Sequence, residues 1–141
     1  MKIVTVSDVR FIAHRYAQTE LAYDEPIPDF ETRYPGILES CLVVPFQKFS
    51  GRDLYRGFAA KAAILFYLMT EGHPFQRGNK RIAMTTLFTF LYVNRKWLEV
   101  DTDEMYEFAV WVAASPERAK DEAAAAMEKF LNKYLVKLKE T

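Results

Sequence analysis

The chain has 141 residues, of which 50% are hydrophobic and 15% aromatic, so we expect one domain over residues 1–141 with a single core and no extended disorder. Its 19 basic and 19 acidic side chains give a net charge of zero, which excludes a global field that would draw it to nucleic acid or to an anionic membrane. The N-terminus lacks the apolar core of a secretory signal, and no uncharged apolar run approaches the ~20 residues that span a bilayer. We therefore expect a cytoplasmic protein, in which the one cysteine, Cys41, is a small buried hydrophobe.

The first third of the chain predicts one helix followed by an irregular stretch. The helix begins after Thr5 or Ser7, either of which can cap it, and runs to about Thr19. Its inner stripe is predicted to be Val9, Ile12, Ala13 and Tyr16. Prolines interrupt residues 23–51 and leave space for one short helix near 37–43, while a short hairpin near 43–49 is the one predicted place for strand.

The middle and last thirds predict four more helices. Apolar residues recur at helical intervals over 53–70, where Gly72 and Pro74 end the pattern, and again from Gly78 or Asn79 to Asn94. Thr102 can cap a helix to about Ala114. Ser115 and Pro116 open the last helix, whose predicted docking stripe is Phe130, Leu131, Tyr134, Leu135 and Leu138. The pattern predicts an all-α domain of about six helices.

A polar, cationic loop from His73 to Arg81 joins the two most apolar helices. If the second helix begins near Gly78 or Asn79, its unpaired N–H groups and positive dipole end face any anion that the loop accepts. His73 is the one side chain of the loop that can accept a proton at cellular pH. The loop therefore predicts a phosphate site beside a general base.

Each candidate residue of this loop also has a structural interpretation. In the functional one His73 is the base, Gly78 and Asn79 bind phosphate oxygens, and Lys80 and Arg81 offset the charge on them. In the structural one Asn79 caps the helix and the two cations are solvated. Phe75 is interpreted as the anchor of the loop on the core. No Walker-type phosphate loop is present, and with His14 and His73 as the only histidines we expect no protein-held metal site of His and Cys ligands.

The motif His73-x-Phe75-x-x-Gly78-Asn79-Lys80-Arg81 resembles the signature of the Fic/Doc family, in its death-on-curing (Doc) toxin branch. The order and spacing of the predicted helices resemble that family across nearly the whole chain, which implies its compact all-α bundle with a short flap. The flap would map near residues 43–51. There Val44, Phe46 and Phe49 either line the flap and bind the target peptide or are loop residues folded over the core.

The resemblance implies an enzyme that uses ATP. Family members that attach AMP have Gly after the Asn and a second Arg three positions after the first, where this chain has Lys80 and Met84. At these two positions the chain thus resembles the Doc toxins. That resemblance implies transfer of the γ-phosphate to a threonine of elongation factor Tu, arrest of translation, and inhibition by a small antitoxin. AMP transfer to a protein hydroxyl, and a binding module of the same fold without turnover, are the alternatives.

Arg77 departs from the family pattern, which has Asp or Glu there as a ligand of magnesium. A guanidinium repels magnesium but can bind phosphate directly. Three interpretations remain open: Arg77 replaces the charge of the metal and joins the phosphate-binding residues, it points away while nucleotide oxygens alone hold Mg²⁺, or transfer activity has been lost.

Overall fold

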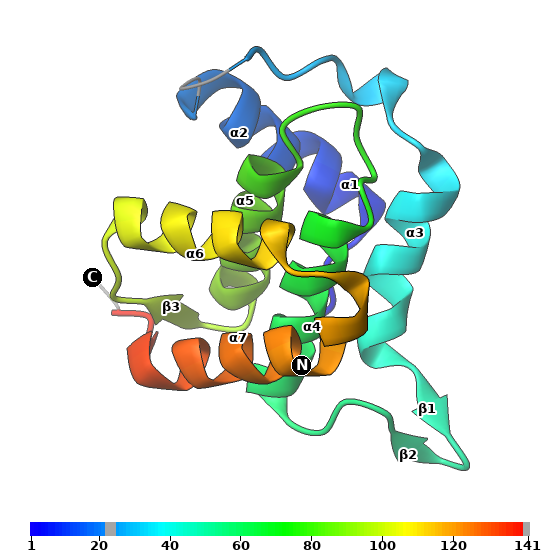
Figure 1. Cartoon of the computed structure of the whole chain (residues 1–141), viewed down its shortest axis with the longest axis vertical. Coiled ribbons are helices and arrows are strands. Elements are labelled where there is room, and N and C mark those ends of the chain that lie inside the picture. The colour runs from blue at the N-terminus through cyan, green and yellow to red at the C-terminus, as the bar shows by residue number, and fades with distance from the viewer. Residues whose placement is uncertain (22–24, 140–141) are drawn as a thin grey trace.

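A computed structural model of the chain describes residues 1–21 and 25–139. The described residues form an all-α bundle, as predicted (Figure 1). Its α-helices are α1 (Val6–Asp8), α2 (Arg15–Glu20), α3 (Pro35–Val43), α4 (Phe58–Glu71), α5 (Asn79–Val93), α6 (Thr102–Ala114) and α7 (Lys120–Tyr134). The π-helix η1 (Val9–His14) joins α1 to α2, so these three segments form one helix, and the described residues contain six such helices. Short 3₁₀ turns are η2 (Phe30–Thr32), η3 (Val44–Phe46) and η4 (Glu117–Ala119).

The first helix begins where its cap was predicted. Thr5 accepts a hydrogen bond from the backbone of Asp8, whose carboxylate accepts one from the backbone of Thr5, so the two residues form a capping box. The predicted inner stripe was half wrong: Val9, Ala13 and Ala17 are buried, whereas Ile12 and Tyr16 are exposed. The buried residues are spaced four apart, so that stripe faces the core, and Ile12 and Tyr16 lie at its edge.

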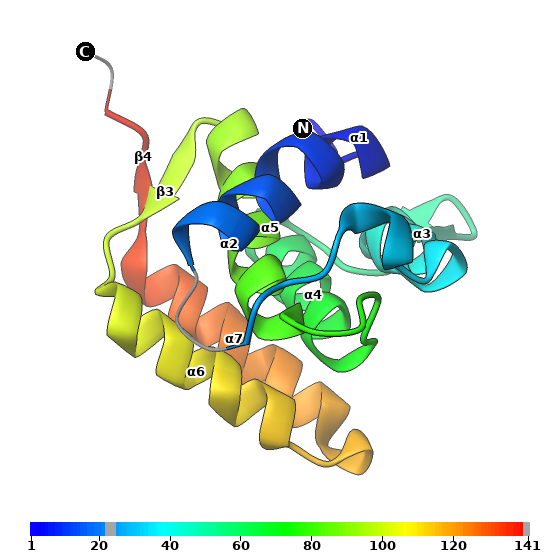
Figure 2. The same cartoon turned by 90° about the horizontal axis from the view of Figure 1, so that it is seen from above.

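The helices α4 and α5 form the centre of the bundle. Viewed from above, the first helix and α3 cover one side of the α4–α5 pair, and α6 and α7 cover the other (Figure 2). Both central helices bury most of their residues, including Phe66, Leu65, Ile82 and Phe90. A pair that is apolar all round is stable only when other elements cover both of its sides, as they do here.

The helix α4 begins later than the sequence pattern indicates. Residues 53–57 are not helical: Asp53 belongs to a hairpin of β1 (Lys48–Phe49) and β2 (Arg52–Asp53), and Gly57 precedes α4 with φ of 86°. The buried ammonium of Lys61 donates to the Asp53 carboxylate at 3.1 Å and to the carbonyl of Tyr55, which holds this segment away from the helix axis. The hairpin predicted near residues 43–49 lies at 48–53. The prediction that no other segment is strand was wrong, because residues 96–98 and 135–137 also pair as strands.

The C-terminal helix ends earlier than predicted, because its last residues pair with a distant strand. Leu135 belongs to β4 (Leu135–Lys137), which pairs antiparallel with β3 (Lys96–Leu98). The predicted docking stripe is therefore helical only through Tyr134, and the strand continues it. At the other end, Ser115 and Pro116 precede η4, and α7 proper begins at Lys120.

Two smaller expectations concern Cys41 and membrane spans. Cys41 is buried, its thiol donates to the carbonyl of Leu68 at 3.3 Å, and burial raises its pKa to about 11. No described helix is long and apolar enough to cross a bilayer. Of the irregular stretch expected over 23–51, Tyr23 and Asp24 lie outside the described residues.

Candidate phosphate site at the start of α5

The loop between α4 and α5 is anchored by Phe75. Its ring is buried and lies 5.5 Å from the ring of His14 and 6.0 Å from that of Phe30, measured between ring centroids. The carbonyl of Pro74 also accepts a hydrogen bond from the backbone of Tyr34 at 2.9 Å. The role predicted for Phe75 is confirmed, and His73 remains exposed beside the anchor.

Asn79 fixes the shape of the loop. Its Oδ1 accepts from the backbone N–H of Phe75 at 3.0 Å, and its Nδ2 donates to the carbonyl of Phe75 at 2.8 Å. This arrangement turns Nδ2 toward Nδ1 of His73, at 3.5 Å. At that length the contact orients the imidazole without fixing which ring nitrogen carries the proton. The main structural role of the Asn79 amide is thus to hold the backbone of the loop at Phe75.

Gly78 is required by its backbone and by its neighbour Ile27. It precedes α5 in the left-handed region with φ of 79°, and a Cβ added there would lie 2.5 Å from Cγ1 of Ile27. Ile27 is itself buried. The glycine therefore lets the loop pack against Ile27, in addition to any approach of a ligand.

The start of α5 leaves backbone donors open. The first hydrogen bond of this helix joins the N–H of Ile82 to the carbonyl of Gly78, so the N–H groups of Asn79, Lys80 and Arg81 precede it. The residue at the N-cap position, Gly78, has no side chain that could cap them. A cavity of about 250 Å³ lies at this helix end. Its lining residues are Glu25, Thr70, His73, Arg77, Gly78, Asn79, Lys80, Arg81 and Ala113.

The cavity thus contains all the loop residues predicted as base or phosphate ligands. His73 and three cationic side chains face a helix N-terminus, the arrangement that binds anions. Three further lining residues were not predicted: Glu25, Thr70 and Ala113. Glu25 and Ala113 come from segments that no local pattern ties to the loop, so spacing alone could not have found them.

Arg81, which was predicted to offset the charge on phosphate oxygens, has hydrogen-bond partners in the backbone of a distant segment. Its side chain is buried, with Nη1 donating to the carbonyl of Leu21 at 2.9 Å and Nη2 to that of Glu25 at 2.7 Å. The guanidinium adds positive charge to the cavity wall while it holds this distant segment in place. Lys80 is half-buried, and no described side chain pairs with its ammonium.

Arg77 pairs with an acid that is distant in sequence. Its Nη1 lies 3.2 Å from Oε2 of Glu25, and both side chains are exposed, by 55% and 68%. The guanidinium therefore lies at the open mouth of the cavity.

Comparison with known proteins agrees with this site. The model of the Fic/DOC family matches residues 4–91, which include the first helix, α3, α4, the site loop and nearly all of α5. The chain belongs to the Fic/Doc family. Toxin Doc of Mycolicibacterium smegmatis (strain ATCC 700084 / mc(2)155) is 32% identical over 75 residues, 53% of this chain and 58% of that protein, so the match spans less than two thirds of the relative. No solved structure matches.

The residues of this Fic/Doc site do not fit a metal ion held by the protein. Among the described residues no group of three or more His, Cys, Asp or Glu side chains could hold one. At the position of the acidic ligand implied by the family, the guanidinium of Arg77 lies instead. Since Arg77 and Lys80 bring like charge to the cavity, they would repel a cation rather than bind it.

The structure does not bring the predicted flap residues to this cavity. The hairpin precedes α4 and the site loop follows it, so they lie at opposite ends of a 14-residue helix, about 20 Å long (Figure 1). Phe46 packs against Phe90 at 5.6 Å between ring centroids, Val44 is half-buried, and Phe49 is 73% exposed at the hairpin. These three residues, which were predicted to bind the target, therefore lie far from His73, the candidate base.

Glu71, the last residue of α4, lies near His73. Its Oε1 is buried and has no hydrogen-bond partner among the described residues. Burial raises the pKa of this carboxyl, the charge of His73 opposes that shift, and the charge of Glu117 adds to it. A carboxyl group is thus held close to the candidate base in an environment that favours its neutral form.

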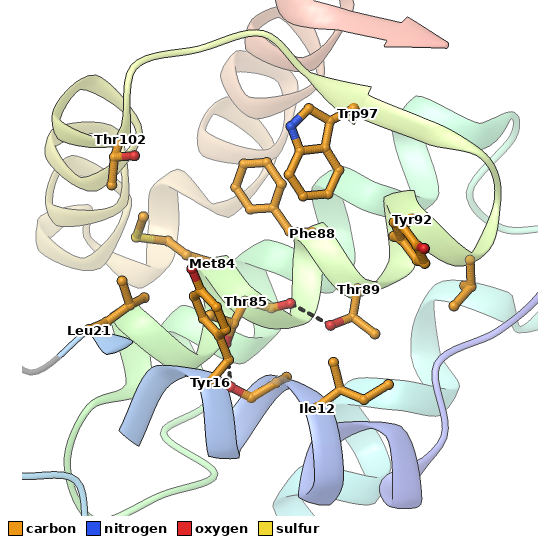
Figure 3. Close-up of a pocket in the computed structure, with 12 residues that line it drawn as sticks. Ile12, Tyr16, Leu21, Met84, Thr85, Phe88, Thr89, Tyr92, Trp97 and Thr102 are labelled. Carbon is orange, nitrogen blue, oxygen red and sulfur yellow. Dashed lines mark hydrogen bonds between the residues drawn. The ribbon is translucent and has the colours of Figure 1, made fainter. Parts of the chain in front are cut away.

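A second, apolar groove lies between the first helix, α5 and β3 (Figure 3). It has a volume of about 380 Å³, and no charged residue of the described part of the chain lines it. Its lining residues are Ile12, Ala13, Tyr16, Leu21, Met84, Thr85, Phe88, Thr89, Tyr92, Val93, Trp97 and Thr102. Ile12 and Tyr16 lie outside the core because they form part of the wall of this groove. Leu21 connects it to the phosphate site, because the carbonyl of this residue accepts from Arg81.

Proposed function

We propose that this Fic/Doc protein is a Doc-like toxin that transfers a phosphoryl group from ATP to a hydroxyl of a target protein. One observation carries the proposal: His73 lines the same cavity as the uncapped start of α5 and three cationic side chains. A base, phosphate donors and a place for the γ-phosphate are what phosphoryl transfer needs.

In this mechanism His73 takes the proton of the target hydroxyl as the hydroxyl oxygen bonds to the γ-phosphorus. The bond between that phosphorus and the β–γ bridging oxygen breaks, and ADP leaves with the electron pair. The N–H groups of residues 79–81 bind phosphate oxygens, and Lys80 offsets the charge that develops on them. Asn79 and Arg81 act by holding the loop and the facing segment in place. No step passes through a metal ion.

The resemblance to Doc toxins extends the proposal to a target and a partner. The target is a threonine of elongation factor Tu, whose modification arrests translation. The partner is a small antitoxin, and a relative named Toxin Doc supports that assignment. We propose that an apolar segment of the antitoxin occupies the groove along α5, because its uncharged wall suits apolar side chains and Leu21 links it to the site.

The test incubates the purified chain with elongation factor Tu and ATP labelled at the α or the γ phosphate, with His73→Ala as the control. Label from the γ phosphate alone that depends on His73 supports the proposal. Label from the α phosphate alone would replace it by AMP transfer. The absence of His73-dependent label from either donor, on elongation factor Tu and in a cell extract, would leave a binding module without turnover.

A further inference from the structure

We propose that Arg77 and Glu25 form an exchangeable ion pair that supplies the cation of the phosphate site. Without a ligand, the Arg77 guanidinium binds the Glu25 carboxylate. When ATP binds, the guanidinium leaves Glu25 and binds phosphate oxygens, so nucleotide binding needs no divalent metal ion and competes with Glu25. The inference rests on the proposed function, because it states how that site binds its nucleotide.

The geometry of the pair favours exchange. The two side chains meet at 3.2 Å and are 55% and 68% exposed, so water screens their attraction and the pair contributes little to stability. Both residues line the cavity. Arg77 therefore reaches an anion in that cavity by side-chain rotation, without leaving its place in the loop.

The backbones on both sides of the pair are fixed. On one side, Phe75 is buried and clamped by Asn79, and Gly78 packs against Ile27. On the other, the carbonyl of Glu25 accepts from the buried guanidinium of Arg81 at 2.7 Å. Since these contacts hold both backbones, the exchange requires only the two side chains to move.

The charges of the cavity give the exchange its direction. Arg77, Lys80 and Arg81 line it together with Glu25, the one acid among the described residues that line it. A bound triphosphate would be attracted by the three cations and repelled by this carboxylate. The planar guanidinium can donate two parallel hydrogen bonds to a phosphate, and such charge-assisted pairs are stronger than an exposed ion pair. The Glu25 carboxylate thus pairs with Arg77 when no ligand is bound, and it repels the phosphates of a bound nucleotide.

The test measures ATP binding to the full chain by calorimetry in EDTA and again in excess Mg²⁺, with variants of both partners. We expect wild type to bind ATP in EDTA, with an affinity that Mg²⁺ changes by less than about 3-fold. Arg77→Gln should weaken binding by about 10-fold, since it removes a charge-assisted bond. Glu25→Gln should tighten it by roughly 2- to 5-fold, since the competing exposed pair is lost.

Glu31→Gln is the matched control, because Glu31 forms an exposed pair with Arg10, at 2.8 Å and with 49% and 66% exposure, and lines neither cavity. It should leave ATP affinity unchanged. If ATP bound only with Mg²⁺ and Glu25→Gln weakened that binding, Glu25 would be a metal ligand and the exchange would be refuted while the proposed function stood. Metal-free binding that Arg77→Gln leaves unchanged would also refute it. If no ATP bound under either condition, both proposals would fail.

Discussion

The side-chain amide of Asn79 binds the backbone of Phe75 twice, accepting from its N–H at 3.0 Å and donating to its carbonyl at 2.8 Å. The first residue of α5 thereby closes the loop that carries His73. The same amide faces the imidazole at 3.5 Å. The shape of the loop and the contact of the His73 ring thus depend on one side chain.

Replacing Asn79 by Ala should therefore lower stability and transfer activity together. Two hydrogen bonds to the Phe75 backbone are lost, and we expect a decrease of about 1–3 kcal/mol in the free energy of unfolding. Urea unfolding followed by tryptophan fluorescence measures it. Asn132→Ala is the control, because Asn132 is exposed on α7. An Asn79→Ala protein as stable as that control would contradict the clamp.

Gly78→Ala should destabilise the protein through both the backbone and the packing. The left-handed conformation at φ of 79° and the contact with Ile27 together predict a loss of about 2–4 kcal/mol. Gly36→Ala is the matched control, since an added Cβ there meets no atom within 4 Å. In Ile27→Ala protein, the further cost of Gly78→Ala should be smaller, because the clash is gone and only the backbone strain remains. Equal costs in both backgrounds would show that Ile27 does not restrict this position.

The buried His14 should make the protein less stable in mild acid. Burial lowers its pKa from 6.5, although a hydrogen bond to the carbonyl of Pro28 at 2.9 Å and the charge of Asp29 oppose the shift. A lowered pKa means that the unfolded chain binds the proton first, so the contribution is present above pH 6.5 and is lost as pH falls through the lower folded value.

Two measurements check this prediction for His14. An NMR titration of its imidazole should give a midpoint below 6.5. His14→Asn should be less stable at neutral pH, because the ring packs between Phe30 and Phe75, but its stability should decrease less between pH 7.5 and pH 5. A midpoint at or above 6.5 would show that the ring is not buried as described.

The contribution of Glu71 to stability should change with pH in the direction opposite to that of His14. Because its folded pKa is raised, the folded state binds the proton more tightly, so the contribution is complete in acid and is lost as pH rises through the folded value. Glu71→Gln should therefore be more stable than wild type at pH 7, and the difference should shrink as pH falls. Thermal unfolding of both proteins from pH 3.5 to pH 7.5 measures it. A variant less stable than wild type at pH 7 would show that the attraction to His73 outweighs burial.

A charge in the apolar groove should weaken binding of the proposed antitoxin. Tyr16→Glu places a carboxylate in the groove, whereas Phe11→Glu places one on the same helix outside it, and both side chains are 55% exposed in wild type. Calorimetry with the proposed antitoxin should show a loss of affinity of at least about 10-fold for Tyr16→Glu, since burying a charge without a partner is costly. Equal effects of the two changes would place the antitoxin elsewhere.

Local sequence determined the helices and the character of the site loop. Thr5 and Asp8 are three residues apart and cap the first helix between themselves, and the apolar periodicity before and after the loop defines α4 and α5. Such signals involve residues within one or two turns of each other, so the sequence reveals them directly. The motif from His73 to Arg81 likewise predicted the family, which the match to residues 4–91 confirms. The phosphate site that it predicted at the start of α5 stays a prediction, and the structure has a cavity there.

The tertiary structure decided the features that join distant segments. Leu135 belongs to a strand because it pairs in antiparallel register with Leu98, far earlier in the chain, and no helical pattern could show that. Arg81 is buried because the carbonyls of Leu21 and Glu25 surround its guanidinium. The sequence showed that Arg77 differs in charge from the acidic residue of the family pattern, but it could not show the partner of Arg77, because Glu25 lies 52 residues away. Local periodicity fixes which residues a helix turns inward; only folding brings an acid from the N-terminal third beside the cation at the mouth of the site.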